Sequence, residues 1–176
     1  MIETPRLLLR RWRASDHAPY AAMMADPEVT YWLGGGQDAA EAEAHIARME
    51  SLFEAGGFGI WALERKADGA FVGSAGLAEV RDDIPFAPAI EVGWRVARRA
   101  WGHGFASEAA AASLADGFSR LGLKEIVSFT AVSNRRSRAV MERLGMMRDA
   151  ARDFDHPKLA PDHPLRPHVV YAMRRP

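Results

Sequence analysis

The fold of this 176-residue chain is decided by the stretch Arg99-Ala-Trp-Gly-His-Gly-Phe-Ala-Ser-Glu108. It follows an alternating apolar run, residues 89–96, and it opens an alanine-rich segment with helical periodicity. A strand, a glycine-containing turn and a helix N-terminus form a cradle for anions, because the first N–H groups of a helix are unpaired and carry roughly half a positive charge. Gly102 and Gly104 lack Cβ atoms, so a phosphate can approach the main chain closely. We therefore expect a ligand that is held by its phosphates at residues 99–107 and reacts elsewhere.

The composition is that of a globular protein with one domain, residues 1–176. Hydrophobic residues make up 48% of the chain, and 23 basic residues balance 23 acidic ones, which argues against a nucleic-acid partner. The lack of cysteine excludes a disulfide framework and a thiol nucleophile, and it fits a reducing compartment, so we expect a cytoplasmic protein. The N-terminus has no signal-peptide pattern, and no apolar run approaches the ~20 residues of a membrane span. We expect no membrane partner.

Strand and helix patterns follow one another in an order that defines the fold class. Period-two runs predict strands at residues 6–12, 58–65, 71–77, 89–96, 125–132, 147–154 and 168–173. Helical spacing predicts helices over residues 15–26, 37–56, 105–121 and 134–144, with loops at 29–36 and 81–88. Asp68-Gly69 predicts a tight hairpin turn. This order favours an α/β domain with a mixed, mostly antiparallel sheet flanked by helices.

Three motifs in this order carry a family resemblance. They are Thr4-Pro-Arg-Leu-Leu-Leu-Arg10, Trp101-Gly-His-Gly-Phe-Ala-Ser-Glu108, and Asn134-Arg-Arg-Ser137 followed by Met141-Glu-Arg-Leu-Gly145. Together they resemble the GNAT superfamily of acetyl-CoA-dependent N-acetyltransferases, and within it the branch that acetylates N-terminal amines of ribosomal proteins. The resemblance implies that strands 89–96 and 125–132 splay apart to form the acetyl-CoA notch. It also implies an enzyme that moves an acetyl group to a primary amine, on a protein N-terminus or a small molecule.

The resemblance also assigns the coenzyme contacts. The pyrophosphate would lie on the glycine loop, and the pantetheine would pair with the backbone of residues 94–96. Asn134 is a helix N-cap by residue type and, by resemblance, a partner of the pantetheine arm. The loop position favours Arg99 over Arg138 as a phosphate partner. The expected coenzyme residues are Trp94, Arg95, Val96, Arg99, Gly102, His103, Gly104, Phe105, Ala106, Ser107, Asn134 and Arg138.

Two residues are catalytic candidates. Glu91 lies within an apolar strand beside the loop, and it is either a carboxylate on a solvated face or a general base that deprotonates the incoming amine, directly or through water. Burial in a cleft that excludes water would raise the pKa of this carboxyl group, which suits a general base. Ser137 is either an exposed helical serine or, by resemblance, the proton donor to the leaving thiolate. Main-chain N–H groups near Val92 to Trp94 would stabilise the oxyanion. Without cysteine, we expect direct transfer.

Aromatic and histidine residues have more than one interpretation. Four aromatic residues are candidates for the acceptor pocket, although residues of this kind are at least as often core: Tyr31, Trp32, Trp61 and Phe86. A histidine- and aspartate-rich segment near the C-terminus fits no compact metal motif, so we expect no metal there and instead a pocket lip or a subunit contact. Its residues are Asp153, Asp155, His156, Asp162, His163 and His168.

Three other functional interpretations compete with this one. Gly102, Gly104 and Ser107 approximate a dinucleotide-binding fingerprint, but they follow several strands, and the next acidic candidate, Glu125, begins its strand instead of ending it. A catalytically silent acyl-CoA-binding module would keep the cradle without the reaction. An RNA-associated factor would need a basic stripe, which the neutral balance does not favour. Family resemblance alone allows a homodimer.

Overall fold

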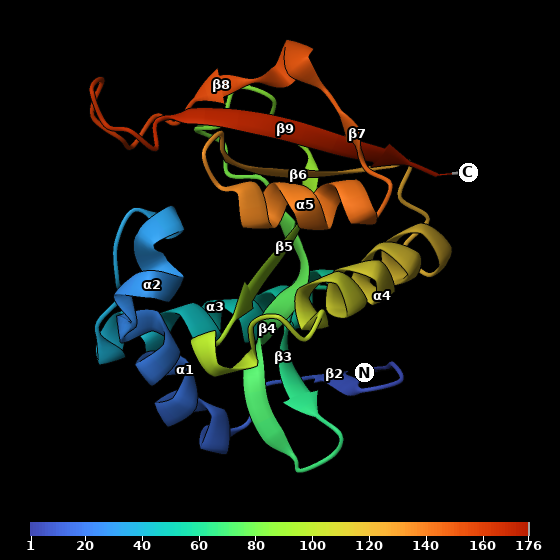
Figure 1. The fold of residues 1–176 in the computed structure, drawn as a ribbon. Coiled ribbons are helices and arrows are strands. Elements are labelled where there is room, and N and C mark those ends of the chain that lie inside the picture. The colour runs from blue at the N-terminus through green and yellow to red at the C-terminus, as the bar shows by residue number, and fades with distance from the viewer. Residues whose placement is uncertain (176) are drawn as a thin grey trace.

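The computed structural model describes residues 1–175 and contains a nine-stranded mixed sheet (Figure 1). The strand order is β1-β2-β3-β4-β5-β6-β9-β7, and β8 pairs with β9. All neighbours are antiparallel except β5 and β6, which confirms the α/β class with a mixed, mostly antiparallel sheet. The strands are β1 (Ile2–Glu3), β2 (Leu7–Arg10), β3 (Ile60–Arg65), β4 (Ala70–Glu79), β5 (Ile90–Val96), β6 (Glu125–Ala131), β7 (Met147–Arg148), β8 (Phe154–Asp155) and β9 (Pro167–Arg174).

Helices cover both faces of this sheet. They are α1 (His17–Ala25), α2 (Pro27–Thr30), α3 (Ala39–Gly56), α4 (Phe105–Ser119) and α5 (Arg135–Arg143). On β4, Phe71 packs with α1 and α3, whereas its neighbour Val72 packs with α4. Successive strand side chains point to opposite faces, so α1 and α3 lie on one side and α4 on the other. Within residues 1–175, no helix combines the length and apolar content needed to cross a bilayer.

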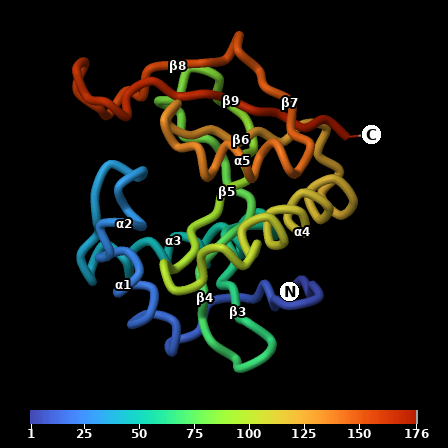
Figure 2. The backbone as a smooth tube through the Cα atoms, viewed as in Figure 1, coloured from blue at the N-terminus to red at the C-terminus, as the bar shows by residue number. Residues whose placement is uncertain are grey.

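The sheet opens between its two parallel strands. Over residues 1–175, β5 and β6 pair at one position, Glu91 with Val127, and they part beyond it. Figure 2 shows β5 running between two halves of the molecule, with β2–β4 and α1–α3 below and β6, β9 and α5 above. The predicted splay of these strands at their C-terminal ends is confirmed, and it leaves one edge of β5 free of a paired strand.

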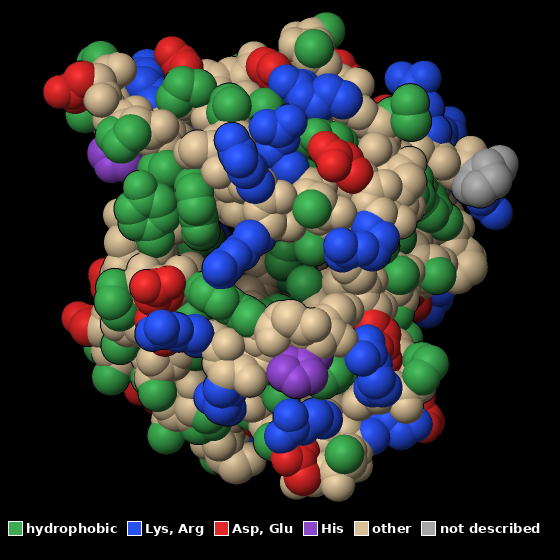
Figure 3. All heavy atoms as spheres, in the orientation of Figure 1, with side chains coloured by type: hydrophobic (Ala, Val, Ile, Leu, Met, Phe, Trp, Pro, Cys, Tyr) green, Lys and Arg blue, Asp and Glu red, His purple; other side chains and the backbone are tan. Residues whose placement is uncertain are grey.

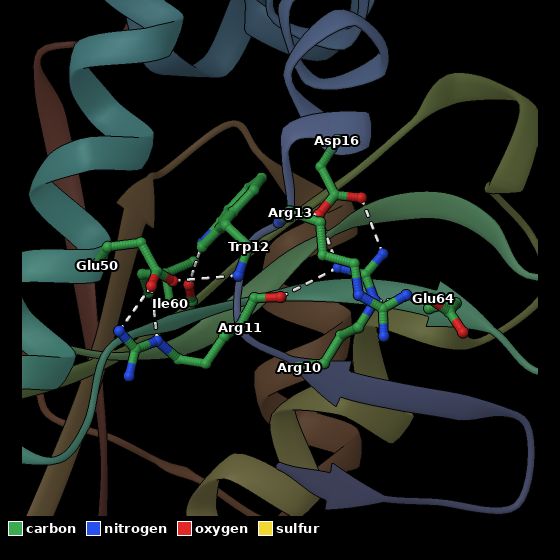
Figure 4. A network of polar contacts seen from close by, with 8 residues as sticks. All are labelled: Arg10, Arg11, Trp12, Arg13, Asp16, Glu50, Ile60 and Glu64. Atoms are coloured by element: carbon green, nitrogen blue, oxygen red, sulfur yellow. Dashed lines mark hydrogen bonds and ion pairs between the residues drawn. The ribbon is translucent and has the colours of Figure 1, made fainter.

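A polar network fixes the entry from β2 into α1 (Figure 4). Arg10 donates from Nη1 and Nη2 to both carboxylate oxygens of Asp16, at 2.6 and 2.8 Å, and from Nε to Glu64 at 2.6 Å. Asp16 also accepts from the backbone N–H of Arg13 at 2.8 Å. Arg10 and Asp16 are buried, so loss of either side chain would leave the other as a buried charge without its main partner.

Two segments differ from the sequence prediction. Residues 29–36 were expected as a loop, but they include the end of α2 and a 3-10 turn, Tyr31–Leu33, because Asp26 caps α2 by accepting from the N–H of Glu28. The expected strand 147–154 is broken into β7, a 3-10 turn at Ala150–Arg152, and β8. There the carboxylate of Asp153 accepts from the N–H of Val170 on β9, in place of a backbone carbonyl.

Candidate active site

A cavity of about 690 Å³ opens where β5 and β6 part. It is lined by α3 on one side, by β4 and β5 below, and by β6 and the start of α5 on the other side. This volume is that of a typical small-molecule site. The cavity brings together both catalytic candidates, Glu91 and Ser137, although they are distant in sequence.

Glu91 lies on β5 beside the pairing with Val127, and its side chain lines the cavity. Burial raises the pKa of this carboxyl group to about 7, and the positive charges of Arg95, Arg81 and Arg48 oppose the rise. No ion pair joins Glu91 to a cation within residues 1–175. A carboxylate with this pKa exchanges its proton near neutral pH, which is the property required of a general base at that pH.

Ser137 is oriented by Asn134, the N-cap of α5. The Asn134 side chain accepts from the Ser137 N–H at 3.2 Å, and its amide donates to the Ser137 Oγ at 3.1 Å and to Thr130 on β6 at 2.9 Å. Because Oγ accepts from the amide, the hydroxyl proton of Ser137 is available to a further acceptor. All three residues line the cavity.

The glycine loop leads from β5 to the N-terminus of α4. Gly102 and Gly104 have φ values of +79° and +77°, a backbone region that glycine reaches without steric cost. Gly104 is the N-cap of α4, and no side chain caps this end. The first N–H groups of α4 are therefore free to bind an anion, as expected of a phosphate cradle.

The N-terminal strand region holds this loop in place. Glu108, in the first turn of α4, accepts from Thr4 Oγ1 at 2.7 Å and from Arg6 N and Nε at 2.8 and 2.7 Å. Arg6 also donates to the carbonyl of His103 at 2.8 Å. Burial raises the pKa of Glu108, but the hydrogen bonds from Thr4 and Arg6 outweigh it and keep the pKa below its usual value.

The structure gives the predicted phosphate arginines other partners. Arg99 donates to the carbonyl of Phe71 at 2.6 Å, and Arg138 donates to the carbonyl of Val132 at 3.0 Å. Two arginines of α5 that the sequence analysis did not select contact the loop instead. They are Arg143, which donates to Ser107 Oγ at 2.9 Å, and Arg136, whose guanidinium lies 4.4 Å from the ring centre of Trp101. Figure 3 shows arginine or lysine side chains around a central hollow on this face.

The other predicted coenzyme residues divide between cavity, core and loop. Trp94 and Arg95 line the cavity. Val96 and Phe105 are buried in the core beneath α4. His103 stacks on Phe105 with ring centres 5.6 Å apart, and Ala106 packs against the same core.

Of the aromatic residues predicted for the acceptor pocket, some lie at the cavity and others in the core. Trp32 lines the cavity, and Tyr31, which is 55% exposed, lies beside it with Arg135 and Arg136 around a second hollow. Trp61 is buried against Phe53, with ring centres 4.1 Å apart. It does not line the cavity, because its neighbour Ile60 points there and side chains alternate along β3.

Phe86 packs behind the cavity wall. Its ring meets those of Phe129 and Phe154 edge to face, at 5.6 and 5.4 Å, and of these three rings only Phe129 lines the cavity. His156 and His168 form part of the opposite rim, with ring centres 5.0 Å apart. Among residues 1–175, no group of three or more histidine, aspartate or glutamate side chains is arranged to hold a metal ion.

A mixed sheet that opens between two parallel strands, beside a glycine loop at a helix N-terminus, is the arrangement expected of a coenzyme-A-dependent acyltransferase. The chain belongs to the GNAT acetyltransferase family: the acetyltransferase (GNAT) domain matches residues 6–147. By family, the protein is an acetyltransferase, and the enzymes of this family use acetyl-CoA as their cosubstrate.

Relatives and solved structures agree with this assignment. The chain is 30% identical over 144 residues to the uncharacterized protein YkkB of Bacillus subtilis (strain 168), covering 81% of this chain and 83% of that one. An acetyltransferase structure from Agrobacterium tumefaciens (strain C58) matches with a TM-score of 0.79 and 28% identity, over 98% of this chain and 93% of that one. RimL, a ribosomal L7/L12 alpha-N-protein acetyltransferase solved with coenzyme A, shares the fold with a TM-score of 0.76 and 16% identity, over 97% and 95% of the two chains. The fold of the expected branch is thus among the neighbours.

Proposed function

We propose that this protein transfers the acetyl group of acetyl-CoA to a primary amine by direct attack, with Glu91 as the general base. The observation that carries the proposal is the position of Glu91. This carboxyl group lies at the point where the sheet opens, and burial brings its pKa to about 7. An amine must lose a proton before its nitrogen can attack a thioester carbonyl, and a carboxylate of this basicity accepts that proton near neutral pH.

The cosubstrate fits the notch along β5. Its pyrophosphate would meet the free N–H groups at the start of α4, beside Gly102 and Gly104. Arg136 and Arg143 lie next to this loop and add positive charge. The pantetheine would run along residues 94–96, on the strand edge that β6 leaves free, and the Asn134 side chain supports the opposite wall.

The chemical step needs one proton acceptor, one oxyanion site and one donor to sulfur. Glu91 takes the proton from the ammonium, and the neutral nitrogen forms a bond to the acetyl carbonyl carbon. Backbone N–H groups of β5 from Val92 to Trp94 stabilise the negative charge that develops on the carbonyl oxygen. As the carbon–sulfur bond breaks, the hydroxyl of Ser137 donates its proton to the sulfur. The bonded nitrogen loses its second proton, which returns through solvent to the Ser137 oxygen. The thiol and the N-acetylated amine leave, and Glu91 returns its proton to solvent.

A silent acyl-CoA-binding module is the alternative, and one assay separates the two. Release of free thiol from acetyl-CoA is measured with a panel of primary amines: N-terminal peptides, polyamines, amino acids and aminoglycosides. The enzyme releases thiol only when an amine is present, and mass spectrometry finds the amine acetylated. A protein that binds coenzyme A in calorimetry but acetylates no amine in the panel would contradict the proposal.

A further inference from the structure

The acceptor side of the cavity contains two arginines without a carboxylate partner. Arg48 on α3 and Arg95 on β5 line the cavity, and neither forms an ion pair within residues 1–175. By contrast, Arg81, which also lines the cavity, pairs with Asp83. Arg95 Nη1 donates to the hydroxyl of Tyr20 at 2.9 Å, which fixes the direction of its guanidinium. Their positive charges are therefore available to a ligand.

Two side chains beside these arginines, His45 and Ser74, are neutral and can donate hydrogen bonds. His45, on α3 one turn before Arg48, lines the same cavity and stacks on Tyr20 with ring centres 5.6 Å apart. Burial, reinforced by the charges of Arg95 and Arg48, lowers the pKa of His45 to about 3. The imidazole is thus neutral at physiological pH and keeps one N–H to donate.

Ser74 supplies an independent sign of a missing ligand. It lies opposite Arg95 in the β4–β5 register and lines the cavity, yet it is only 1% exposed. Its hydroxyl has no hydrogen-bond partner within residues 1–175. Buried hydroxyl groups are almost always paired, because an unpaired one loses its bonds to water and gains nothing in return. A ligand oxygen at this place would satisfy it.

We propose that Arg48, His45, Arg95 and Ser74 form a subsite for an anionic group on the acceptor, a carboxylate or a phosphate. The inference rests on the proposed function, because it makes the acceptor an amine that also carries an acid. Glu91 and Arg95 lie on the same face of β5, four residues apart, so roughly 13 Å separates their Cα atoms. The ammonium of the acceptor would lie at the Glu91 end and its anionic group at the Arg95 end.

Coenzyme A does not account for this subsite. Its phosphates belong at the N-terminus of α4. Its pantetheine arm carries no charge and would pair with the backbone of residues 94–96, which leaves the side chain of Arg95 without a coenzyme partner. Nor does an internal ion pair account for it, since Glu91 and Arg95 face one cavity without forming a salt bridge. The opposite charges at the two ends of the cavity instead suit a ligand with opposite charges at its own two ends.

Binding without turnover is the first test. The protein is saturated with coenzyme A, which fills the phosphate cradle, and binding of glutarate, inorganic phosphate and neutral glutaramide is measured by saturation-transfer NMR. We expect glutarate or phosphate to bind at least about tenfold more tightly than glutaramide, and the stronger of the two identifies the anion. Arg48→Met and Arg95→Met should each abolish the preference. Arg48 is exposed on α3, so its variant should fold even if loss of the Arg95–Tyr20 bond disturbs the other.

Two further variants complete this test. Ser74→Ala should weaken glutarate binding while raising the melting temperature, because it removes an unpaired buried hydroxyl. Lys124→Met removes an exposed cation outside the cavity, so it should leave the preference for glutarate unchanged. Equal binding of glutarate, phosphate and glutaramide to the wild type would overturn the subsite, as would a preference that survives both arginine substitutions.

Turnover separates failure of the subsite from failure of the proposed function. The acceptors are ω-amino carboxylates of increasing chain length, the matching carboxamides, and aminoalkyl phosphates. The wild type should acetylate an anionic acceptor with kcat/KM at least about tenfold above its neutral partner, and Arg95→Met should lose this ratio. Acetylation of neutral and anionic amines at equal rates would overturn the subsite and leave the proposed function standing. Anion binding that depends on Arg95, with no amine acetylated, would contradict the proposed function and leave the subsite standing.

Discussion

Glu91 on β5 and Val127 on β6 form the one Cα pair that joins the two parallel strands within residues 1–175. The sheet is closed at this pair and open beyond it, so the carboxylate of Glu91 lies at the closed end of the notch. Pairing further along β5 would fill the space that the acetyl and pantetheine groups need. The same geometry therefore opens the cavity and places the proposed base, Glu91, within it.

The first prediction concerns the glycine loop. Gly102→Ala forces a side chain into a left-handed backbone region, where non-glycine residues pay roughly 1–2 kcal/mol. The backbone should relax away from φ +79° and turn its N–H groups out of the cradle. Calorimetry should show a loss of coenzyme A affinity of about tenfold or more, or ~1.4 kcal/mol.

Gly122→Ala is the matched control for this substitution. Gly122 has a φ of +68°, and a Cβ there would meet open space, as it would at Gly102. Both variants should lose similar stability in urea denaturation, but Gly122→Ala should bind coenzyme A as the wild type does. Equal loss of affinity in the two variants would show that strain alone, and no specific cradle, explains the effect.

The second prediction concerns Ser137. The Asn134 amide donates to the Ser137 Oγ, so the hydroxyl proton is available for the proposed transfer to the leaving sulfur. Ser137→Ala should lower kcat roughly tenfold or more with little change in coenzyme A affinity, because the interaction strengthens only in the transition state. The loss should shrink with an acyl donor whose thiol is more acidic. The exposed Ser119, at the end of α4 and outside the cavity, provides the control Ser119→Ala. An equal loss with both acyl donors would mean that Ser137 only positions the coenzyme.

The Arg10–Asp16 pair makes a prediction about stability. Asp16→Asn leaves the buried guanidinium with only Glu64 as an anionic partner, and breaking a buried pair of this kind costs about 3 kcal/mol. Urea denaturation measures the loss. Asp68→Asn, in the exposed pair between Arg65 and Asp68, should change stability little. Equal losses of unfolding free energy in the two variants would show that the buried Arg10–Asp16 pair contributes no more to stability than the exposed pair.

The same pair predicts a pH dependence. Burial raises the pKa of Asp16, but the hydrogen bonds from Arg10 and Arg13 outweigh it and lower the pKa below the ordinary value. A carboxyl with a lowered folded-state pKa stabilises the fold above its unfolded pKa and loses this contribution as pH falls. Acidification should therefore narrow the stability difference between wild type and Asp16→Asn. A difference that stays constant down to acid pH would contradict this account.

Local patterns in the sequence predicted most of the fold. The glycine loop, the capped helix from Asp38, the Asp68-Gly69 hairpin and the order of strands are local signals, so they can be recognised without tertiary information. The segment 147–154 was not predictable in this way. Its strand is broken because a side chain, Asp153, takes a position in the pairing with β9 that only the folded sheet defines.

In the candidate site, too, some features follow from local sequence patterns and others only from tertiary packing. Glu91, Ser137 and Asn134 meet in one cavity. The expectation that Ser137 and Asn134 lie beside the coenzyme came from the family resemblance, because local patterns place residues on strands and helices but do not bring those elements together. Alternation says that Ile60 and Trp61 point to opposite faces, but not which face becomes the cavity. The sequence therefore left Trp61 open between the acceptor pocket and the core, where the structure has it packed against Phe53. Arg136 and Arg143, seven residues apart on α5, share a helix face, yet only tertiary packing places that face on the loop.

The measurement that tests the account most directly is the pH profile of kcat/KM for wild type and Glu91→Gln, with acetylated amine quantified by mass spectrometry. The wild-type rate should rise through an inflection near pH 7, because burial raises the pKa of Glu91 to about 7 and only the deprotonated carboxylate accepts the proton. Glu91→Gln should bind acetyl-CoA nearly as well, lose roughly 10²-fold or more in turnover at neutral pH, and lack the inflection. Its deficit should shrink at high pH, where more of the amine is already neutral. A variant with the wild-type rate near neutral pH, or one that keeps the inflection, would contradict the assignment of Glu91 as the base.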